Sequence, residues 1–287
     1  MSTSAPPLPA VRAALSRLID YAGLFPPAKL DLAPAVSEYA ALRRGRFSWM
    51  LGRFIIVESR ISELSQAMPQ DEAPFAVSVI LDRGERTPPL PAGGTVEIGA
   101  VEIPLSDADA RSAVAAIEAS GAGSLPAYAE WPRAGEPPER MMGDLASAGI
   151  GAKIRMGGLT AAAFPEPAEV AQFVCAAARH RVPFKATAGL HHPIRHVDVS
   201  TGFRMHGFLN LLFAAVCAHG GARESEIAQI LADEDPSNFR FNSDGLRYRD
   251  RAASTAAIET VRRELFAGYG SCSIDEPTAD LQQLGLI

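Results

Sequence analysis

Short runs of apolar and β-branched residues recur along the chain, and most are followed by a longer segment with a different periodicity. We interpret these runs as eight β-strands, at 18–25, 52–59, 74–82, 95–105, 125–132, 151–158, 183–192 and 266–274. In the intervening stretches apolar residues recur every three or four positions, which predicts helices at 32–44, 107–120, 136–149, 166–180 and 206–221. Strands that alternate with helices are typical of a parallel sheet.

Eight such units in a chain of 287 residues predict a (β/α)₈ barrel, the TIM-barrel class of α/β fold, as a single domain over 1–287. An open doubly wound sheet is the alternative. Residues 221–265 are too long for one helix, and contain a hairpin pattern around Asn242 to Gly245 and then a helical segment. We expect them to form an insertion before the last strand. The linker 83–94 between the third and fourth strands has the composition of a loop.

Composition and charge narrow the classes of partner. The chain has a formal net charge of -6 and a pI near 5.6, so it has no overall attraction for nucleic acid or anionic membrane. It contains no apolar run long enough to span a bilayer, and its first residues lack the pattern of a secretory signal. Three widely spaced cysteines suggest reduced thiols. We therefore expect a cytoplasmic, soluble globular protein, and the sequence also allows a homo-oligomer.

Polar side chains gather in the C-terminal parts of the expected strands. Alternate residues of a barrel strand face the interior and the surrounding helices. In the seventh strand Phe184 and Ala186 suit the helix side, which leaves Lys185 pointing inward. Active sites of this fold lie at the C-terminal ends of the strands. The candidate residues collected at this rim are Asp82, Glu102, Glu130, Lys153, Arg155, Thr187, Lys185, His191, His192 and Ser271.

Lys185 is the leading catalytic candidate. A lysine inside a barrel and beside Phe184 is expected to have a lowered pKa, because burial penalises the charged amine. A neutral amine can attack a carbonyl group and form a Schiff base. The alternative is a fixed cation that pairs with Glu130 or holds an anionic substrate. Both interpretations remain open from the residues alone.

The segment "KATAG" at 185–189 resembles the Lys-x-Ser/Thr-x-Gly strand of class I aldolases of the deoxyribose-phosphate aldolase type. Those enzymes are (β/α)₈ barrels in which this lysine forms the Schiff base and a second lysine lowers its pKa. The resemblance implies that Lys185 is the nucleophile and that Lys153 or Arg155 supplies the second charge. Segments "DYAGLFPPA", "KIRMGG", "KATAGLHHP" and "GSCSIDEP" are also similar to a bacterial TIM-barrel-like family without an established activity.

The end of the sixth strand, "KIRMGG", suggests recognition of an anion. Arg155 can grip a carboxylate or a phosphate with two hydrogen bonds. Gly157 and Gly158 would let main-chain N–H groups approach a ligand. We therefore expect these residues, together with Thr187, Glu102, Asp82 and Ser271, to bind the substrate.

His191 and His192 follow the seventh strand directly. One of them could serve as a general acid or base beside the lysine. Either could instead bind a metal ion together with Glu102, Glu130 or Asp82, as in barrel hydrolases. Adjacent residues in an extended chain point to opposite sides, which disfavours a site that uses both histidines.

These residues predict a metal-independent and cofactor-free lyase or isomerase that acts on a small anionic carbonyl compound. Lys185 and Lys153 would be catalytic, with Glu130 and His191 or His192 moving protons. No glycine fingerprint for a dinucleotide is present. The alternatives are a metal-dependent hydrolase that uses the same rim and a non-catalytic protein that binds a small acid.

Overall fold

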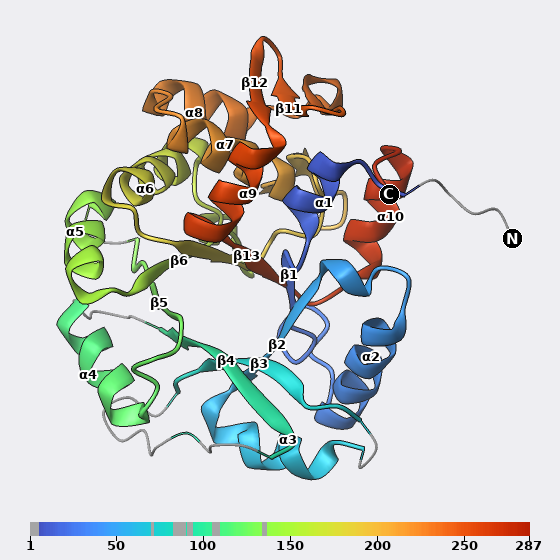
Figure 1. The fold of residues 1–287 in the computed structure, drawn as a ribbon, viewed down its shortest axis with the longest axis vertical. Helices are drawn as coiled ribbons and strands as arrows, with labels where there is room; N and C mark the ends of the chain where they lie inside the picture. Colours follow the sequence, from blue (N-terminus) through green and yellow to red (C-terminus); the bar gives the residue numbers. More distant parts are fainter. Residues whose placement is uncertain (1–5, 70–71, 83–89, 91–93, 105–109, 134–136) are drawn as a thin grey trace, which may run out of the picture.

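The central element is a closed barrel of eight parallel strands (Figure 1). The computed structural model describes residues 6–69, 72–82, 90, 94–104, 110–133 and 137–287. The strand order is β1-β13-β7-β6-β5-β4-β3-β2. The bounds are β1 Ile19–Tyr21, β2 Leu51–Val57, β3 Phe75–Ile80, β4 Val96–Ile103, β5 Ala127–Glu130, β6 Gly151–Arg155, β7 Phe184–Thr187 and β13 Phe266–Ser271. Seven of the eight lie within the expected strand segments, and β2 begins one residue before its segment, so the (β/α)₈ barrel is confirmed and the open sheet is wrong.

Helices surround the barrel on its outer side (Figure 1). They are α1 Pro9–Leu15, α2 Leu32–Arg44, α3 Ile61–Ala67, α4 Ala110–Ser120, α5 Pro138–Ala148, α6 Pro167–His180, α7 Phe208–His219, α8 Glu224–Ala232, α9 Thr255–Glu264 and α10 Asp275–Gln283. Each expected helix is present, and α2 has the expected bounds. Asp107, at the start of the expected helix at 107–120, and most of the linker 83–94 lie outside the described residues.

Local sequence explains where these helices begin and end. Glu166 and Glu169 form a capping box at the start of α6, which satisfies main-chain N–H groups that have no partner inside the helix. Gly149 ends α5 in the left-handed conformation, with φ of 68°, which glycine adopts without steric cost. The helices therefore stop at the points where the chain has to turn back into the barrel.

Aromatic residues fill the layer between barrel and helices. Phe184 of β7 contacts Phe173 of α6, with ring centroids 5.5 Å apart. On the other side of the barrel, Phe54 of β2 lies 5.3 Å from Tyr39 of α2. These outward-facing residues alternate with the inward-facing polar residues, as the strand periodicity requires.

Residues 221–265 form α8, an antiparallel sheet and α9 before the last barrel strand. The sheet consists of β10 Phe239–Phe241, β11 Gly245–Tyr248 and β12 Arg251–Ser254. Asn242 accepts hydrogen bonds from the main-chain N–H groups of Asp244 and Gly245, which forms the expected turn. Phe239 and Leu246 belong to the same hydrophobic core as the barrel residues.

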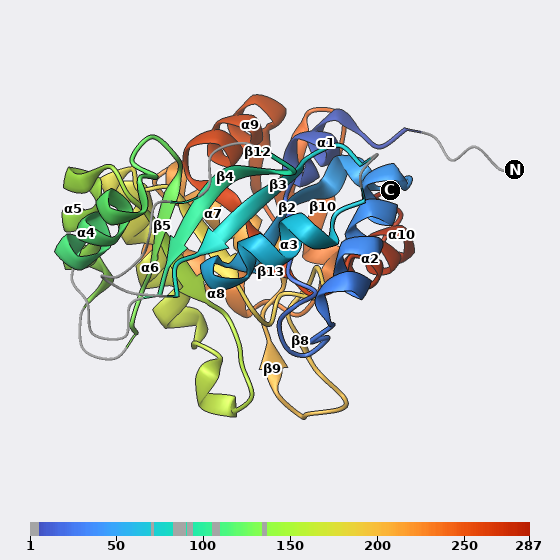
Figure 2. The same ribbon diagram turned by 90° about the horizontal axis from the view of Figure 1, so that it is seen from below.

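The two ends of the barrel carry different structures. Figure 2 shows α1 and α9 at one end, and a small ribbon of β8 His196–Val197 and β9 Arg204–Met205 at the other. The ribbon follows β7 and therefore marks the C-terminal end of the strands. In the described residues, we find no helix with the length and apolar character needed to cross a lipid bilayer.

Candidate functional site

Six ionisable side chains of alternating charge contact one another in sequence inside the barrel and toward its C-terminal end. Asp20 contacts Lys185 at 2.5 Å, and Lys185 contacts Glu102 at 2.7 Å. Glu102 contacts Lys153 at 2.8 Å, and Lys153 contacts Glu130 at 3.1 Å. Glu130 finally pairs with Arg155 at 2.9 Å. Three carboxylates therefore balance three cations, and we call this set, from Asp20 to Arg155, the charge chain.

Lys185 is a buried ammonium group with a full set of acceptors. Its side chain is 2 % exposed, and its Nζ donates to Asp20, to Glu102 and, at 3.4 Å, to the hydroxyl of Ser78. Burial by itself lowers the pKa of Lys185, but the carboxylates of Asp20 and Glu102 outweigh it and raise this pKa above its usual range. The expected lowering of the Lys185 pKa is therefore wrong, and the amine is charged at neutral pH.

Glu102 is the centre of the charge chain. It is fully buried, and its two carboxylate oxygens separately contact Lys185 and Lys153. Burial opposes ionisation, but the two lysines hold the pKa of Glu102 well below its usual range. The hydroxyl of Ser78 donates a further hydrogen bond to Glu102 at 2.7 Å. Such extensive pairing is what allows a carboxylate to stay charged in a barrel interior.

The last barrel strand, β13, leaves room for the contact between Asp20 and Lys185. β13 lies between β1 and β7, with Gly270 beside Asp20 and Gly268 beside Lys185 in the register. Because neither glycine has a side chain, the Asp20 carboxylate and the Lys185 amine can meet across β13. A Cβ on Gly270 would lie 2.9 Å from Cδ1 of Ile55, which shows how closely side chains pack over this strand.

Glu130 and Arg155 form the end of the charge chain nearest solvent. They are the last residues of β5 and β6, and their side chains are 14 % and 50 % exposed. Glu130 remains ionised because Lys153 and Arg155 lower its pKa against the effect of burial. Arg155 uses Nε for Glu130, and its terminal nitrogens make no hydrogen bond to the described residues. Thr187, the last residue of β7, lies beside Arg155 in the register.

The glycine pair after β6 has a packing role in this structure. A Cβ on Gly157 would lie 2.7 Å from the ring of Phe164 and 3.0 Å from Cα of Gly189. A Cβ on Gly158 would lie 2.7 Å from Cβ of Ala163. Gly157 therefore lies where the segments after β6 and β7 cross closely, and Gly158 lies where the segment after β6 folds back on itself, so packing explains the pair without a ligand.

The two histidines turn toward α10, away from the charge chain. Nδ1 of His191 lies 3.0 Å from the carboxylate of Glu276, and Nδ1 of His192 lies 2.6 Å from that of Asp280. The ring of His192 also contacts the ring of His196. Neither histidine contacts a lysine of the charge chain. The structure therefore does not bring His191 and His192 together with Lys185.

Asp82 and Ser271 also lie apart from the charge chain. Asp82 is exposed and accepts hydrogen bonds from the main-chain N–H and the hydroxyl of Ser59, which hold the turn after β2. Ser271 donates its hydroxyl to the carbonyl of Ser273. In β13 it lies on the same side as Tyr269, which stacks on Phe208 of α7, so it faces the helices. The expected inward face of Ser271 is wrong, because Gly270 holds the inward position.

Asp20 and Ser78, which both contact Lys185, were not among the candidate residues selected from the sequence. From the sequence, Asp20 could serve at the rim or equally well form a structural salt bridge, because it lies near the start of its expected strand. Ser78 lies in a strongly apolar strand, "FAVSVI". The available signal was strand alternation, because Ser78 takes an inward-facing position in its strand. In the structure it pairs in register with Ile55 of β2.

The described residues offer no ready-made set of metal ligands. Among them, no group of three or more histidine, cysteine, aspartate or glutamate side chains lies close enough to hold a metal ion. Glu102 and Glu130, two of the expected ligands, are instead paired with Lys153. The hydrolase alternative therefore gains no support from the placement of these residues.

Comparison with known proteins does not identify the function of this site. No protein-family model matches the chain, and no curated protein matches it at a significant level. The function therefore has to be argued from the barrel and its charge chain.

Proposed function

We propose that the chain is a metal-independent enzyme that acts on a small anionic carbonyl compound at the C-terminal mouth of the barrel. The reaction would cleave or form a carbon–carbon bond, or move a proton next to the carbonyl group. The observation that carries this proposal is the arrangement of Glu130 between Lys153 and the half-exposed Arg155. It combines a proton acceptor, a buried cation and an anion-binding group within contact distance, at the barrel end where this fold builds active sites.

Arg155 is the group suited to hold the acid group of the substrate. Its guanidinium is anchored on one edge by Glu130 and keeps its terminal nitrogens free of hydrogen bonds to the described residues. A carboxylate or phosphate can accept two parallel hydrogen bonds from such a group. The anchor also fixes the plane of the guanidinium, which places the bound substrate in a defined orientation.

Glu130 is the proton acceptor in this proposal. Its lowered pKa keeps it ionised at neutral pH, although the same neighbours reduce its basicity. Removal of a proton next to a carbonyl places negative charge on the carbonyl oxygen. The ammonium group of Lys153 uses two of its three N–H bonds for Glu102 and Glu130, which leaves one that can donate to that oxygen.

Lys185 acts as an electrostatic group in this proposal. A Schiff base requires a neutral amine with a free lone pair, whereas Lys185 is charged and donates to three acceptors. It holds Glu102 ionised, and Glu102 in turn orients Lys153. The three cysteines are free thiols, which fits a reducing compartment, and we propose the cytoplasm as the location.

The test follows proton exchange in D₂O by NMR, across a panel of small 2-oxo acids and phosphorylated aldehydes. We expect the protein to exchange or cleave at least one of them. Glu130→Gln should lower kcat about 10²-fold or more, because it removes the proton acceptor. Arg155→Gln should raise KM about tenfold, because it removes a charge-assisted contact. Glu63→Gln, at an exposed pair with Arg60, is the control and should leave both values unchanged.

Two results would contradict this proposal. The first is saturable binding of panel compounds without turnover, which would favour a protein that only binds small acids. The second is turnover that Glu130→Gln leaves unchanged. Borohydride reduction during turnover separates the two roles of the lysine. An unmodified Lys185 is expected, and an adduct on it would replace the electrostatic role with a Schiff base.

A further inference from the structure

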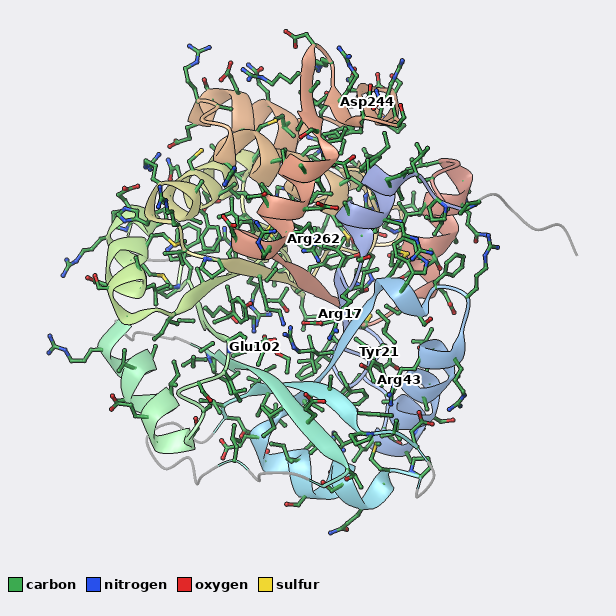
Figure 3. The ribbon with its side chains drawn as sticks, in the orientation of Figure 1. Arg17, Tyr21, Arg43, Glu102, Asp244 and Arg262 are labelled. Atoms are coloured by element: carbon green, nitrogen blue, oxygen red, sulfur yellow. The ribbon has the colours of Figure 1, made fainter. Side chains whose placement is uncertain are left out.

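A cavity of about 970 Å³ opens at the N-terminal end of the barrel, opposite the mouth that contains Glu130 and Arg155. The residues that line it precede or begin the strands. Arg17 lies before β1, Arg53 lies in the first half of β2, and Tyr128 lies near the start of β5. Figure 3 shows Arg262 on α9 and Arg17 in the segment that leads from α1 into β1. The cavity therefore belongs to a different end of the molecule from the proposed active site.

Positive charge is concentrated in this cavity. Its charged lining residues are Arg12, Arg17, Arg53, Arg262, Arg263 and Glu259. Five arginines and one glutamate give a formal charge of +4 in a chain whose net charge is -6. Such a concave surface with charge of one sign focuses the electric field and attracts anions.

Several of these arginines have unused hydrogen-bonding capacity. Arg17 and Arg53 make no ion pair with any described residue. Arg262 donates from its terminal nitrogens to the carbonyls of Phe266 and Ser16, but its buried Nε has no partner among the described residues. A buried donor without an acceptor is unfavourable. An oxyanion in the cavity would supply acceptors to these groups.

The inner wall of the cavity adjoins the charge chain. Tyr128 is 6 % exposed, and its ring centroid lies 5.7 Å from Nζ of Lys185. The main-chain N–H of Arg53 donates to the carboxylate of Asp20 at 2.6 Å. The inner wall of the cavity is therefore tied to the paired charges of the barrel interior, and the hydrogen bond to Asp20 fixes the main chain of Arg53.

We infer that this cavity is a second ligand site, which binds a small multivalent oxyanion carrying phosphate or carboxylate groups. The guanidinium fork matches both groups, and the cavity volume is in the range that accommodates a small metabolite. Several converging arginines favour a ligand with more than one negative charge over a simple monoanion. The proposal does not depend on chemistry at the opposite mouth.

Calorimetric titration of the full chain with inorganic pyrophosphate, citrate and acetate tests this inference. We expect pyrophosphate, citrate or both to bind saturably and acetate to bind much more weakly. Arg17→Gln and Arg53→Gln should each weaken that binding about tenfold, the loss of one charge-assisted contact. The Asp20 contact uses the main chain of Arg53, so Arg53→Gln retains it.

Arg111→Gln is the matched control, because it removes the same charge from the exposed start of α4. It should change affinity less than about twofold, and circular dichroism should show that all three variants are folded. Binding of pyrophosphate but not citrate would identify phosphate as the ligand group, and the reverse would identify carboxylate. The inference is overturned if neither anion binds, or if Arg17→Gln and Arg53→Gln bind as tightly as Arg111→Gln.

Discussion

The amine of Lys185 contacts the carboxylate of Asp20 at 2.5 Å, although 165 positions separate the two residues in the sequence. The contact passes across β13, the last strand to enter the barrel. It therefore connects β1 to β7 over the strand that closes the sheet. A pair of this kind forms only when the first and last parts of the chain are both in place.

Replacement of Lys185 by methionine should strongly destabilise the fold. Lys185→Met would leave the buried carboxylates of Asp20 and Glu102 without their shared cation. We expect a loss of about 3–5 kcal/mol of unfolding free energy in urea denaturation. Lys29→Met, at an exposed lysine, should change stability by less than about 0.5 kcal/mol. Equal stability of the two variants would contradict the buried pairing.

Ser78 should contribute less than Lys185, because it is a neutral member of the buried cluster. Ser78→Ala removes the hydroxyl that donates to Glu102 at 2.7 Å but retains both lysine contacts of that carboxylate. We expect a loss of about 1–3 kcal/mol, typical of a hydrogen bond to a charged group. Ser62→Ala, at an exposed serine of α3, is the comparison in the same urea experiment. A smaller effect at Ser78 than at Ser62 would argue against the hydrogen bond to Glu102.

Gly151 should tolerate no side chain. A Cβ at this position would lie 2.6 Å from the ring of Tyr128 and 2.7 Å from the carbonyl oxygen of Pro183. The carbonyl is main chain and belongs to the pairing of β6 with β7, so it cannot move away freely. Gly151→Ala should therefore cost about 1–3 kcal/mol. Gly123→Ala, where a Cβ would meet no atom within 4 Å, should leave the thermal midpoint unchanged or slightly higher.

His206 should make stability depend on pH in the mildly acidic range. Its Nε2 donates to the carbonyl of Pro165, and burial lowers its pKa from 6.5 to about 4. Between these values the unfolded chain binds a proton that the folded chain does not. The contribution of neutral His206 to the unfolding free energy is therefore complete above pH 6.5. It decreases by about 3 kcal/mol as the pH drops toward 4.

His206→Gln isolates that contribution, because glutamine does not titrate and can still donate to the Pro165 carbonyl. Unfolding free energies of both proteins should be measured in urea between pH 7 and pH 4. The wild-type protein should lose more stability than the variant over this range. Parallel pH profiles would show that His206 is protonated in the folded state as easily as in the unfolded chain.

Strand periodicity was sufficient to place the inward-facing lysines. Phe184 and Ala186 flank Lys185 with apolar side chains of opposite parity, and the same alternation surrounds Lys153. Because a barrel strand has only an inner and an outer face, alternation fixes the direction of each side chain. The same reasoning places Glu130 beside Lys153, since both lie on neighbouring strands.

Local sequence could not predict where the two histidines lie, and it could not predict that Lys185 is charged. His191 and His192 follow β7, but their carboxylate partners, Glu276 and Asp280, come from a helix near the end of the chain. The burial of Lys185 could be inferred from its neighbours, which suggested a lowered pKa. The opposite direction results from Asp20 and Glu102, which come from β1 and β4.

The amino-acid pattern alone favoured the (β/α)₈ architecture and predicted the approximate strand positions and the inward faces of Lys153 and Lys185, because these depend on periodicities that extend over a few residues. It did not predict the face of Ser271 in β13. The tertiary structure decided which charged groups meet, and hence that Lys185 is an ammonium ion held by two carboxylates. Electrostatic energy depends on separation in space. Barrel closure sets that separation between residues that the sequence leaves far apart.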